Sequence, residues 1–106
     1  MCSHEMVWYL TQFVQLLGKL VQTKDTSILE LIEMVDHDAR YYLDVEKEQC
    51  LDTDPILRNM ETIFERARKA TFHCVKTNKW ELLQSLAAEL IVVRDALKKS
   101  STKGTT

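Results

Sequence analysis

The sequence predicts an all-α protein, an antiparallel up-down-up-down four-helix bundle, and three observations lead to this fold class. The 106 residues include only two glycines and one proline, too few for the many turns of a β-sandwich or barrel. Four segments carry apolar residues at spacings of three and four, which is the period of an amphipathic helix. The connections between them are mostly short, so neighbouring helices are expected to run antiparallel.

The first two helices are predicted from the apolar residues of the N-terminal half. The first extends from about Glu5 to Val21, and its apolar face consists of Met6, Leu10, Phe13, Leu17 and Leu20. The second begins at Ser27, because Ser27 and Glu30 have the spacing of a capping box. It ends near Val45, and its face consists of Ile28, Ile32, Val35, Ala39 and Tyr42.

The third and fourth helices follow a polar loop predicted over residues 46–53. Asp54 and Pro55 favour a helix start, and the face of the third helix consists of Ile56, Met60, Ile63, Ala67, Ala70 and Cys74. The small Ala67 and Ala70 would let a neighbour approach closely. Asn78 and Glu81 repeat the capping-box spacing before the fourth helix, whose face consists of Leu83, Leu86, Leu90, Val93 and Leu97. One domain is expected over residues 1–99, with a disordered polar tail at 100–106.

Composition and charge exclude several classes of protein. The net charge of −2 gives no general attraction to nucleic acid or to membranes. No apolar run approaches the roughly 20 residues that span a bilayer, and the N-terminus lacks a signal-peptide pattern, so a cytoplasmic protein is expected. Three single cysteines do not form a disulfide framework, and Cys74 is predicted in the core. Seven acidic residues lie within 36–54 and five basic residues within 66–79. They are interpreted either as two solvated faces that attract each other or as a basic strip for an acidic partner.

His37 and His73 are the candidate residues for metal binding and for phosphotransfer. Di-metal carboxylate bundles need Glu-x-x-His, and neither His37 nor His73 has a glutamate three residues before it. Phosphotransfer bundles carry an exposed histidine with a base three residues later, which His37 with Arg40 and His73 with Lys76 resemble. Both pairs lack the glycine that follows this base in such domains. We expect no metal and no cofactor.

The spacing of Arg68 and His73 resembles the Arg-x4-His motif of HEPN-type ribonucleases. A histidine base and an arginine for the phosphate would make chemical sense. On a continuous helix the two side chains diverge by about 140°, so they would not meet at one phosphate within one chain. We therefore expect no catalysis.

Aromatic and apolar residues beside the strict helix faces favour a protein-binding surface. Trp8 and Trp80 lie in the first turns of their helices, where they either pack the ends of the bundle or stay exposed. The predicted partner-binding residues lie along the third and fourth helices and comprise the apolar Phe64, Val75, Leu82 and Ile91 with the basic Arg68, Lys69 and Lys76. Phe64 is alternatively a core residue. Contiguous exposed apolar patches are typical of partner grooves.

The second half of the chain resembles the flagellin-specific export chaperones, a family of small cytoplasmic four-helix proteins. The resemblance rests on the segments 59–64 (Asn-Met-Glu-Thr-Ile-Phe), 77–79 (Thr-Asn-Lys) and 93–96 (Val-Arg-Asp-Ala). It implies a non-enzymatic holdase that covers aggregation-prone helices of a disordered client in apolar grooves. We therefore expect a cytoplasmic export or assembly chaperone or adaptor. The alternative is a self-associating structural or regulatory bundle, such as a phage, plasmid or toxin–antitoxin component, which would form a homodimer.

Overall fold

The computed structural model describes residues 2–46 and 55–103. Their regular structure consists of five helices: α1 (Cys2–Thr23), α2 (Ile28–Val45), α4 (Pro55–Arg58), α5 (Met60–Lys76) and α6 (Trp80–Lys103). No strand occurs within these two ranges, so the predicted all-α class is confirmed. No helix of the described part of the chain is long and apolar enough to cross a membrane.

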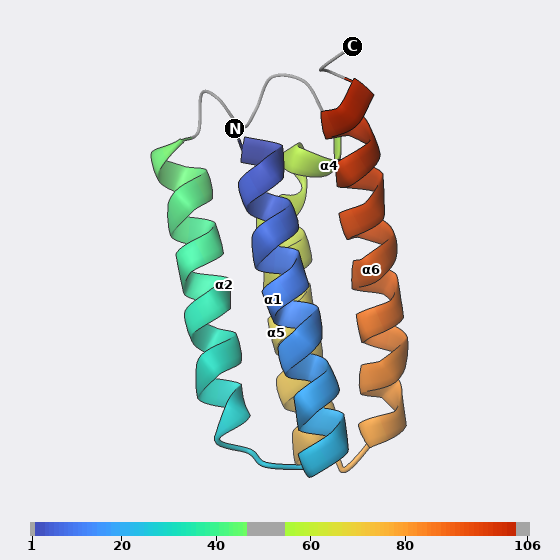
Figure 1. The fold of residues 1–106 in the computed structure, drawn as a ribbon. Coiled ribbons are helices and arrows are strands. Elements are labelled where there is room, and N and C mark those ends of the chain that lie inside the picture. The colour runs from blue at the N-terminus through green and yellow to red at the C-terminus, as the bar shows by residue number, and fades with distance from the viewer. Residues whose placement is uncertain (1, 47–54, 104–106) are drawn as a thin grey trace.

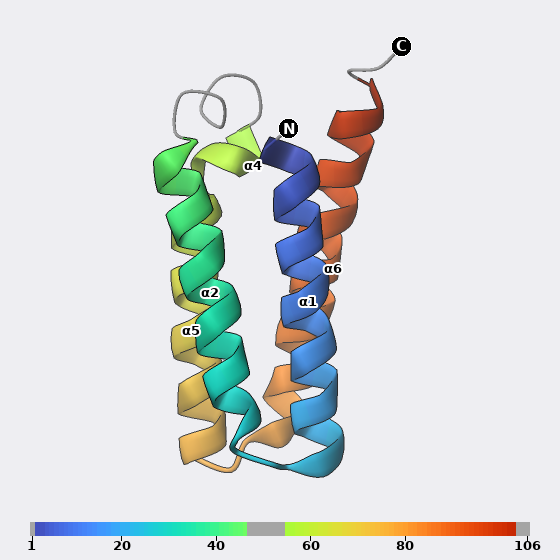
Figure 2. The ribbon, with the colours of Figure 1, turned by 60° about the vertical axis from the view of Figure 1, so that its left-hand side comes forward.

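The four long helices lie side by side in an elongated body of 43 × 24 × 16 Å (Figure 1). α1 packs most extensively against α6 and also contacts α2, and α5 contacts α2 and α6 on the other side. Each long helix runs opposite to the one before it, and α4 lies at the same end as the N-terminus of α1 (Figures 1 and 2). The α1–α2 face is therefore opposite the α5–α6 face.

The core follows the helix period of the sequence closely. The five predicted face residues of α1 are fully buried: Met6, Leu10, Phe13, Leu17 and Leu20. Phe13 meets Phe64 of α5 at the centre of the body, with ring centroids 6.1 Å apart. Cys74 is buried as predicted. Burial of such side chains, at about 1.5–3 kcal/mol for each large one, is the main source of stability for a domain of this size.

Two predicted capping boxes are wrong. Ser27 has helical backbone angles and its side chain makes no capping hydrogen bond. Instead, Asp25 Oδ1 accepts hydrogen bonds from the backbone N–H and the hydroxyl of Ser27, at 3.0 and 2.7 Å. Asn78 lies two residues before α6 in the left-handed region, with φ of 60°, and its Oδ1 accepts a hydrogen bond from Nε1 of Trp80 at 3.1 Å. Short polar side chains therefore stabilise both turns, but through hydrogen bonds other than those of a capping box.

The helix boundaries also differ from the prediction. The third predicted helix is divided at Asn59 into α4 and α5, and Nδ2 of Asn59 donates to the carbonyl of Pro55 at 3.1 Å. α6 continues to Lys103, into the segment predicted as a polar tail. Of the predicted loop at 46–53, all but Glu46 lies outside the described residues, as does Asp54.

Candidate protein-binding surface

A groove lies between α5 and α6, the neighbouring long helices that contact each other least. It has a volume of about 310 Å³ and is lined by Ile63, Arg66, Ala67 and Ala70 of α5 and by Leu86, Glu89, Leu90 and Val93 of α6. Ala67 and Leu90 are buried and form its floor, whereas the exposed Arg66 and Glu89 lie at its edges. The groove is therefore apolar inside and charged at the rim.

Small side chains on α5 keep this groove open. Ala67 and Ala70 carry a single methyl group each, whereas α6 contributes the larger Leu86, Leu90 and Val93. Helix axes pack about 8–10 Å apart depending on the side chains at the contact, and alanine permits the closest approach. Here α6 does not come close enough to fill the space above the alanines. The groove is thus available to side chains of another helix.

Basic side chains occupy the outer face of α5 next to the groove, and we call Arg66, Lys69, His73 and Lys76 the basic row. Of these four, Arg66 lines the groove itself. Their spacings of three, four and three residues place them on one face of α5, and all four are exposed. Lys69 lies 3.1 Å from Glu65, and its hydrogen bond holds the pKa of the Glu65 carboxyl below the ordinary value. Arg66 and Lys76 have no acidic partner within the described residues. The outer face of α5 therefore carries uncompensated positive charge, whereas the rim of the groove itself carries one cation, Arg66, and one anion, Glu89.

Two of the predicted apolar anchors have clear positions in the structure. Leu82 is 46% exposed and lies one helical turn before Leu86, on the groove side of α6. Phe64 is 1% exposed and packs against Phe13. This corrects the placement of Phe64 on the partner surface: it is a core residue, and a partner cannot contact it in this fold.

The other two predicted anchors lie away from the groove. Val75 is half-buried and packs against the core. Ile91 is also half-buried, and it follows Leu86 by five residues, which places it about 140° further around α6. Neither residue lines the groove. Of the four predicted apolar anchors, only Leu82 therefore lies beside this groove.

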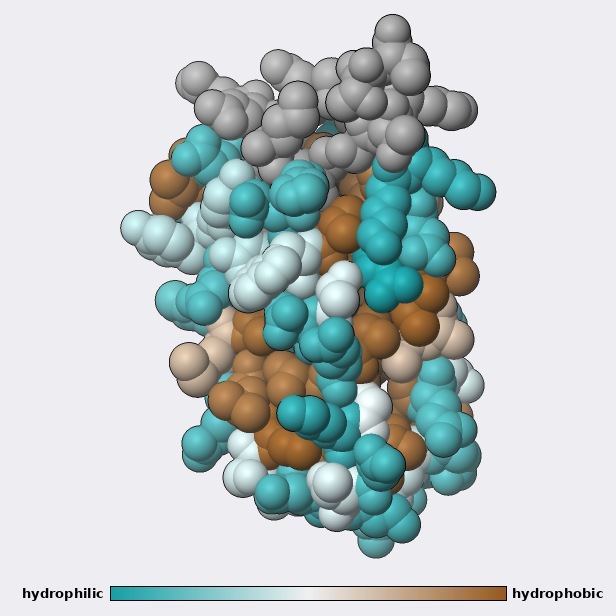
Figure 3. Space-filling model, in the orientation of Figure 1, coloured by the Kyte–Doolittle hydropathy of each residue, from teal (hydrophilic) through white to brown (hydrophobic). Residues whose placement is uncertain are grey.

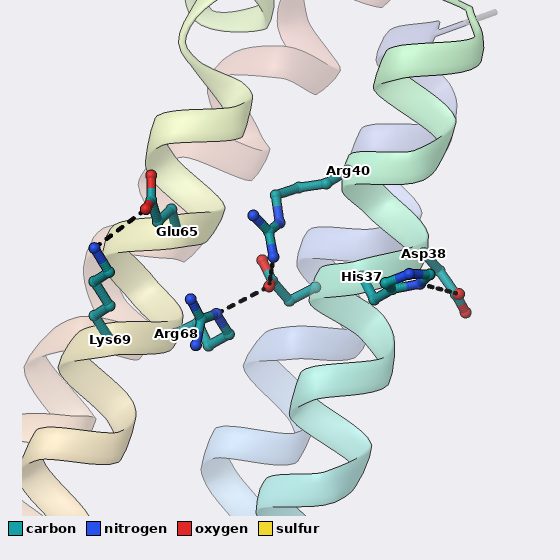
Figure 4. A network of polar contacts seen from close by, with 7 residues as sticks. His37, Asp38, Arg40, Glu65, Arg68 and Lys69 are labelled. Atoms are coloured by element: carbon teal, nitrogen blue, oxygen red, sulfur yellow. Dashed lines mark hydrogen bonds and ion pairs between the residues drawn. The ribbon is translucent and has the colours of Figure 1, made fainter.

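Arg68 is the predicted basic residue that the structure places elsewhere. Its Nε lies 3.1 Å from Oδ2 of Asp36, and Nη2 of Arg40 lies 2.9 Å from the same oxygen (Figure 4). Arg68 therefore links α5 to α2 and is not positioned to steer a partner to the groove. The ion pair also joins the acidic and basic segments of the sequence within the fold. Lys69 and Lys76 remain exposed in the basic row.

Asp36 is an unusual core residue, because its side chain is only 1% exposed. Burial raises the pKa of its carboxyl, and the opposing effect of Arg40 and Arg68 is smaller. The side chains of Arg40 and Arg68 are 38% and 25% exposed, so water partly screens their attraction for the carboxylate. The other carboxylate oxygen, Oδ1, has no hydrogen-bond partner within the described residues. The sequence contained a signal for this burial, since Asp36 follows Ile32 by four residues on the apolar face of α2.

The histidines considered for catalysis are both exposed. Nδ1 of His37 lies 3.6 Å from Oδ1 of the adjacent Asp38 (Figure 4). His73 belongs to the basic row of α5. Arg68 is engaged with Asp36 between the helices, so it does not share a site with His73. Within residues 2–46 and 55–103, no three His, Cys, Asp or Glu side chains are grouped as metal ligands would be.

The α5–α6 groove is accompanied by a second apolar pocket of about 320 Å³ between α1 and α6. Comparison with known proteins adds no relative to this chain. No family model, no curated protein and no solved structure matches the chain.

Proposed function

We propose that this chain is a non-enzymatic protein-binding bundle of up-down-up-down topology that covers the apolar face of a client's amphipathic helix in the cytoplasm. That activity is the one expected of an export or assembly chaperone or adaptor. The observation that supports it is the α5–α6 groove, which is apolar inside and lies next to the basic row on the outer face of α5.

A helix is the partner that suits the shape of this groove. Leu82, Leu86, Leu90 and Val93 recur along α6 at helical spacing, over eleven residues from first to last. At 1.5 Å per residue they extend for about 16 Å, or roughly three turns. An amphipathic helix presents side chains at the same spacing, so its apolar row can enter a groove of this kind.

Charge favours a client helix with acidic residues beside its apolar row. The basic row would attract such a helix and repel one with lysines in the same positions. Exposed ion pairs are each worth only about 0–1 kcal/mol, so the apolar contacts must supply most of the affinity. A contact of this size lies at the small end of protein interfaces, so we expect micromolar dissociation constants.

Two designed peptides of about 18 residues test the proposal. Both carry leucines at spacings of three and four, and one has glutamates beside the leucines where the other has lysines. Fluorescence anisotropy at about 0.15 M salt measures their binding to the full chain. The glutamate peptide should bind saturably, with a dissociation constant at least about tenfold lower than that of the lysine peptide.

Filling the groove supplies the matched control. Ala70→Leu places a larger side chain in the groove and should weaken binding of the glutamate peptide at least about tenfold. Ala88→Leu makes the same change at an exposed position of α6 that does not line the groove, and it should leave binding unchanged. Saturable binding that Ala70→Leu leaves intact, or an equal affinity for both peptides, would refute the proposal.

A further inference from the structure

The outer surface of α2 carries an apolar row that no other helix of the described residues covers. Leu31, Met34, Tyr41 and Val45 are each 47–65% exposed. Their spacings are three, seven and four residues, with Asp38 at the intervening position, so they form one stripe along the helix. Figure 3 shows apolar side chains gathered over the lower part of α2. Such a stripe is what an amphipathic helix presents to a partner.

Acidic side chains accompany this stripe. Glu30, Glu33 and Asp44 are exposed on the neighbouring face of α2 and have no basic partner within the described residues. Asp38 pairs only with the adjacent His37, at 3.6 Å. α2 therefore has the two properties that the α5–α6 groove requires of a partner: an apolar row at helical spacing and acidic residues beside it.

The stripe and the groove lie on different sides of the molecule. Asp36 faces α5 through its ion pair with Arg68, and Met34, two residues earlier, lies about 160° away around α2. Met34 shares a surface pocket with Arg68 of α5. The groove lies further away, between α5 and α6, and these two helices lie behind α2 and α1 in Figure 2. A molecule cannot place its own α2 row in its own groove.

We propose that the α2 row of one copy of this chain docks in the α5–α6 groove of a second copy when no client is bound, an inference that rests on the proposed function of that groove. The contact is heterologous: the acidic residues beside the row meet the basic row of the other copy. A symmetric α2–α2 contact would instead bring Glu30, Glu33 and Asp44 of two copies together, and like charges oppose it.

The size of the contact makes this association weak. The row extends from Leu31 to Val45, about 21 Å at 1.5 Å per residue, and engages one helix face only. One helix in one groove buries less than the 1,200 Å² or so at which stable interfaces begin. Copies therefore associate at high concentration, and the α2 row of one copy then covers the groove of another. They separate when a client helix binds in the groove.

Charge reversal on each side tests the inference. The α2-reversed chain carries Glu30→Lys and Glu33→Lys, and the α5-reversed chain carries Arg66→Glu and Lys76→Glu; all four residues are exposed and unpaired within the described part. Sedimentation equilibrium of the wild-type chain should show concentration-dependent association. Each reversed chain alone should associate at least about tenfold more weakly, and an equimolar mixture should regain association. If the α5-reversed chain associates as strongly as the wild-type chain, the inference is overturned. A symmetric α2–α2 contact would give that result, because it does not involve α5.

The glutamate peptide separates this inference from the proposed function. It should dissociate wild-type assemblies, and the α2-reversed chain should bind it with wild-type affinity because its groove is intact. A wild-type chain that binds the peptide but stays monomeric at every concentration would overturn the self-docking and leave the groove proposal standing. A chain that associates but does not bind the peptide would refute the groove proposal and, with it, this inference.

Discussion

Replacing Phe64 by alanine should remove a large part of the stability of the fold. The side chain is 1% exposed and contacts Phe13 across the centre of the core. Buried Phe→Ala substitutions cost about 3–5 kcal/mol, since transfer free energy is lost and a cavity remains. Domains of this size have a free energy of unfolding of about 5–15 kcal/mol in total. A loss of about 4 kcal/mol should lower the melting temperature by roughly 16–30 °C.

Leu82→Ala provides the matched comparison on the surface. Burying a leucine fully is worth about 1.5–3 kcal/mol, and Leu82 is 46% exposed, so its truncation should cost about half of that, or about 0.8–1.6 kcal/mol. The effects on binding should be reversed. Leu82→Ala should weaken the glutamate peptide severalfold, whereas Phe64→Ala should leave its affinity unchanged at temperatures where the variant is folded.

Urea denaturation followed by circular dichroism, together with peptide anisotropy on the same samples, measures both quantities. If Phe64→Ala does not fold, the milder Phe64→Leu, expected to cost about 1.5 kcal/mol or less, takes its place in the binding assay. The reasoning fails if Phe64→Ala costs less than about 1 kcal/mol, or if Leu82→Ala destabilises the chain as much as Phe64→Ala does.

Three further predictions concern Asp36, Gly18 and Cys74. Burial raises the pKa of the Asp36 carboxyl, so the folded state holds its proton more tightly than the unfolded state. Its contribution to stability is present below the ordinary value of 3.8 and is lost as pH rises through the raised value. Asp36→Asn should flatten that decline in urea denaturation measured at a series of pH values above 3.8, and an unchanged slope would contradict it. Gly18→Ala should raise the free energy of unfolding by about 0.5–1 kcal/mol, because an added Cβ meets nothing within 4 Å in the exposed part of α1, and a loss of stability would count against this. In a Cys2→Ser/Cys50→Ser chain, the buried Cys74 should react with a thiol reagent far more slowly without urea than with it, and equal rates would show that the site opens freely.

The buried faces could be predicted from the sequence because they depend on local spacing. The apolar residues from Met6 to Leu20 can lie together on only one face of a helix. In the structure this face is completely buried. The break at Asn59 could not be predicted in this way. Ile56, Met60 and Ile63 keep the helix period straight through it, so the apolar pattern alone gives no sign that α4 ends there.

The groove depends on distances between helices, which spacing along one helix does not contain. Two small residues such as Ala67 and Ala70 are equally consistent with closely packed helices and with an open groove, so the sequence does not distinguish the two arrangements. Phe64 stayed ambiguous for a related reason. It follows Met60 by four residues and sits beside the predicted face, so its burial depends on how far α5 is rotated toward Phe13.

The buried contact between Asp36 and Arg68 also determines how α2 and α5 align along their length. Apolar side chains are largely interchangeable, so two helices joined by them alone could slide past each other by a turn, about 5.4 Å, and still bury similar area. Such a slide would place Asp36 level with Phe64 or Phe72, one turn to either side of Arg68, and leave Arg40 of its own helix as its remaining partner. The buried carboxylate would lose one of its two partners, so the contact penalises the shifted alignments even if it adds little to the stability of the native one. A single charged residue in the core thus selects one vertical alignment of the two helices, as a lone polar residue does in a coiled coil.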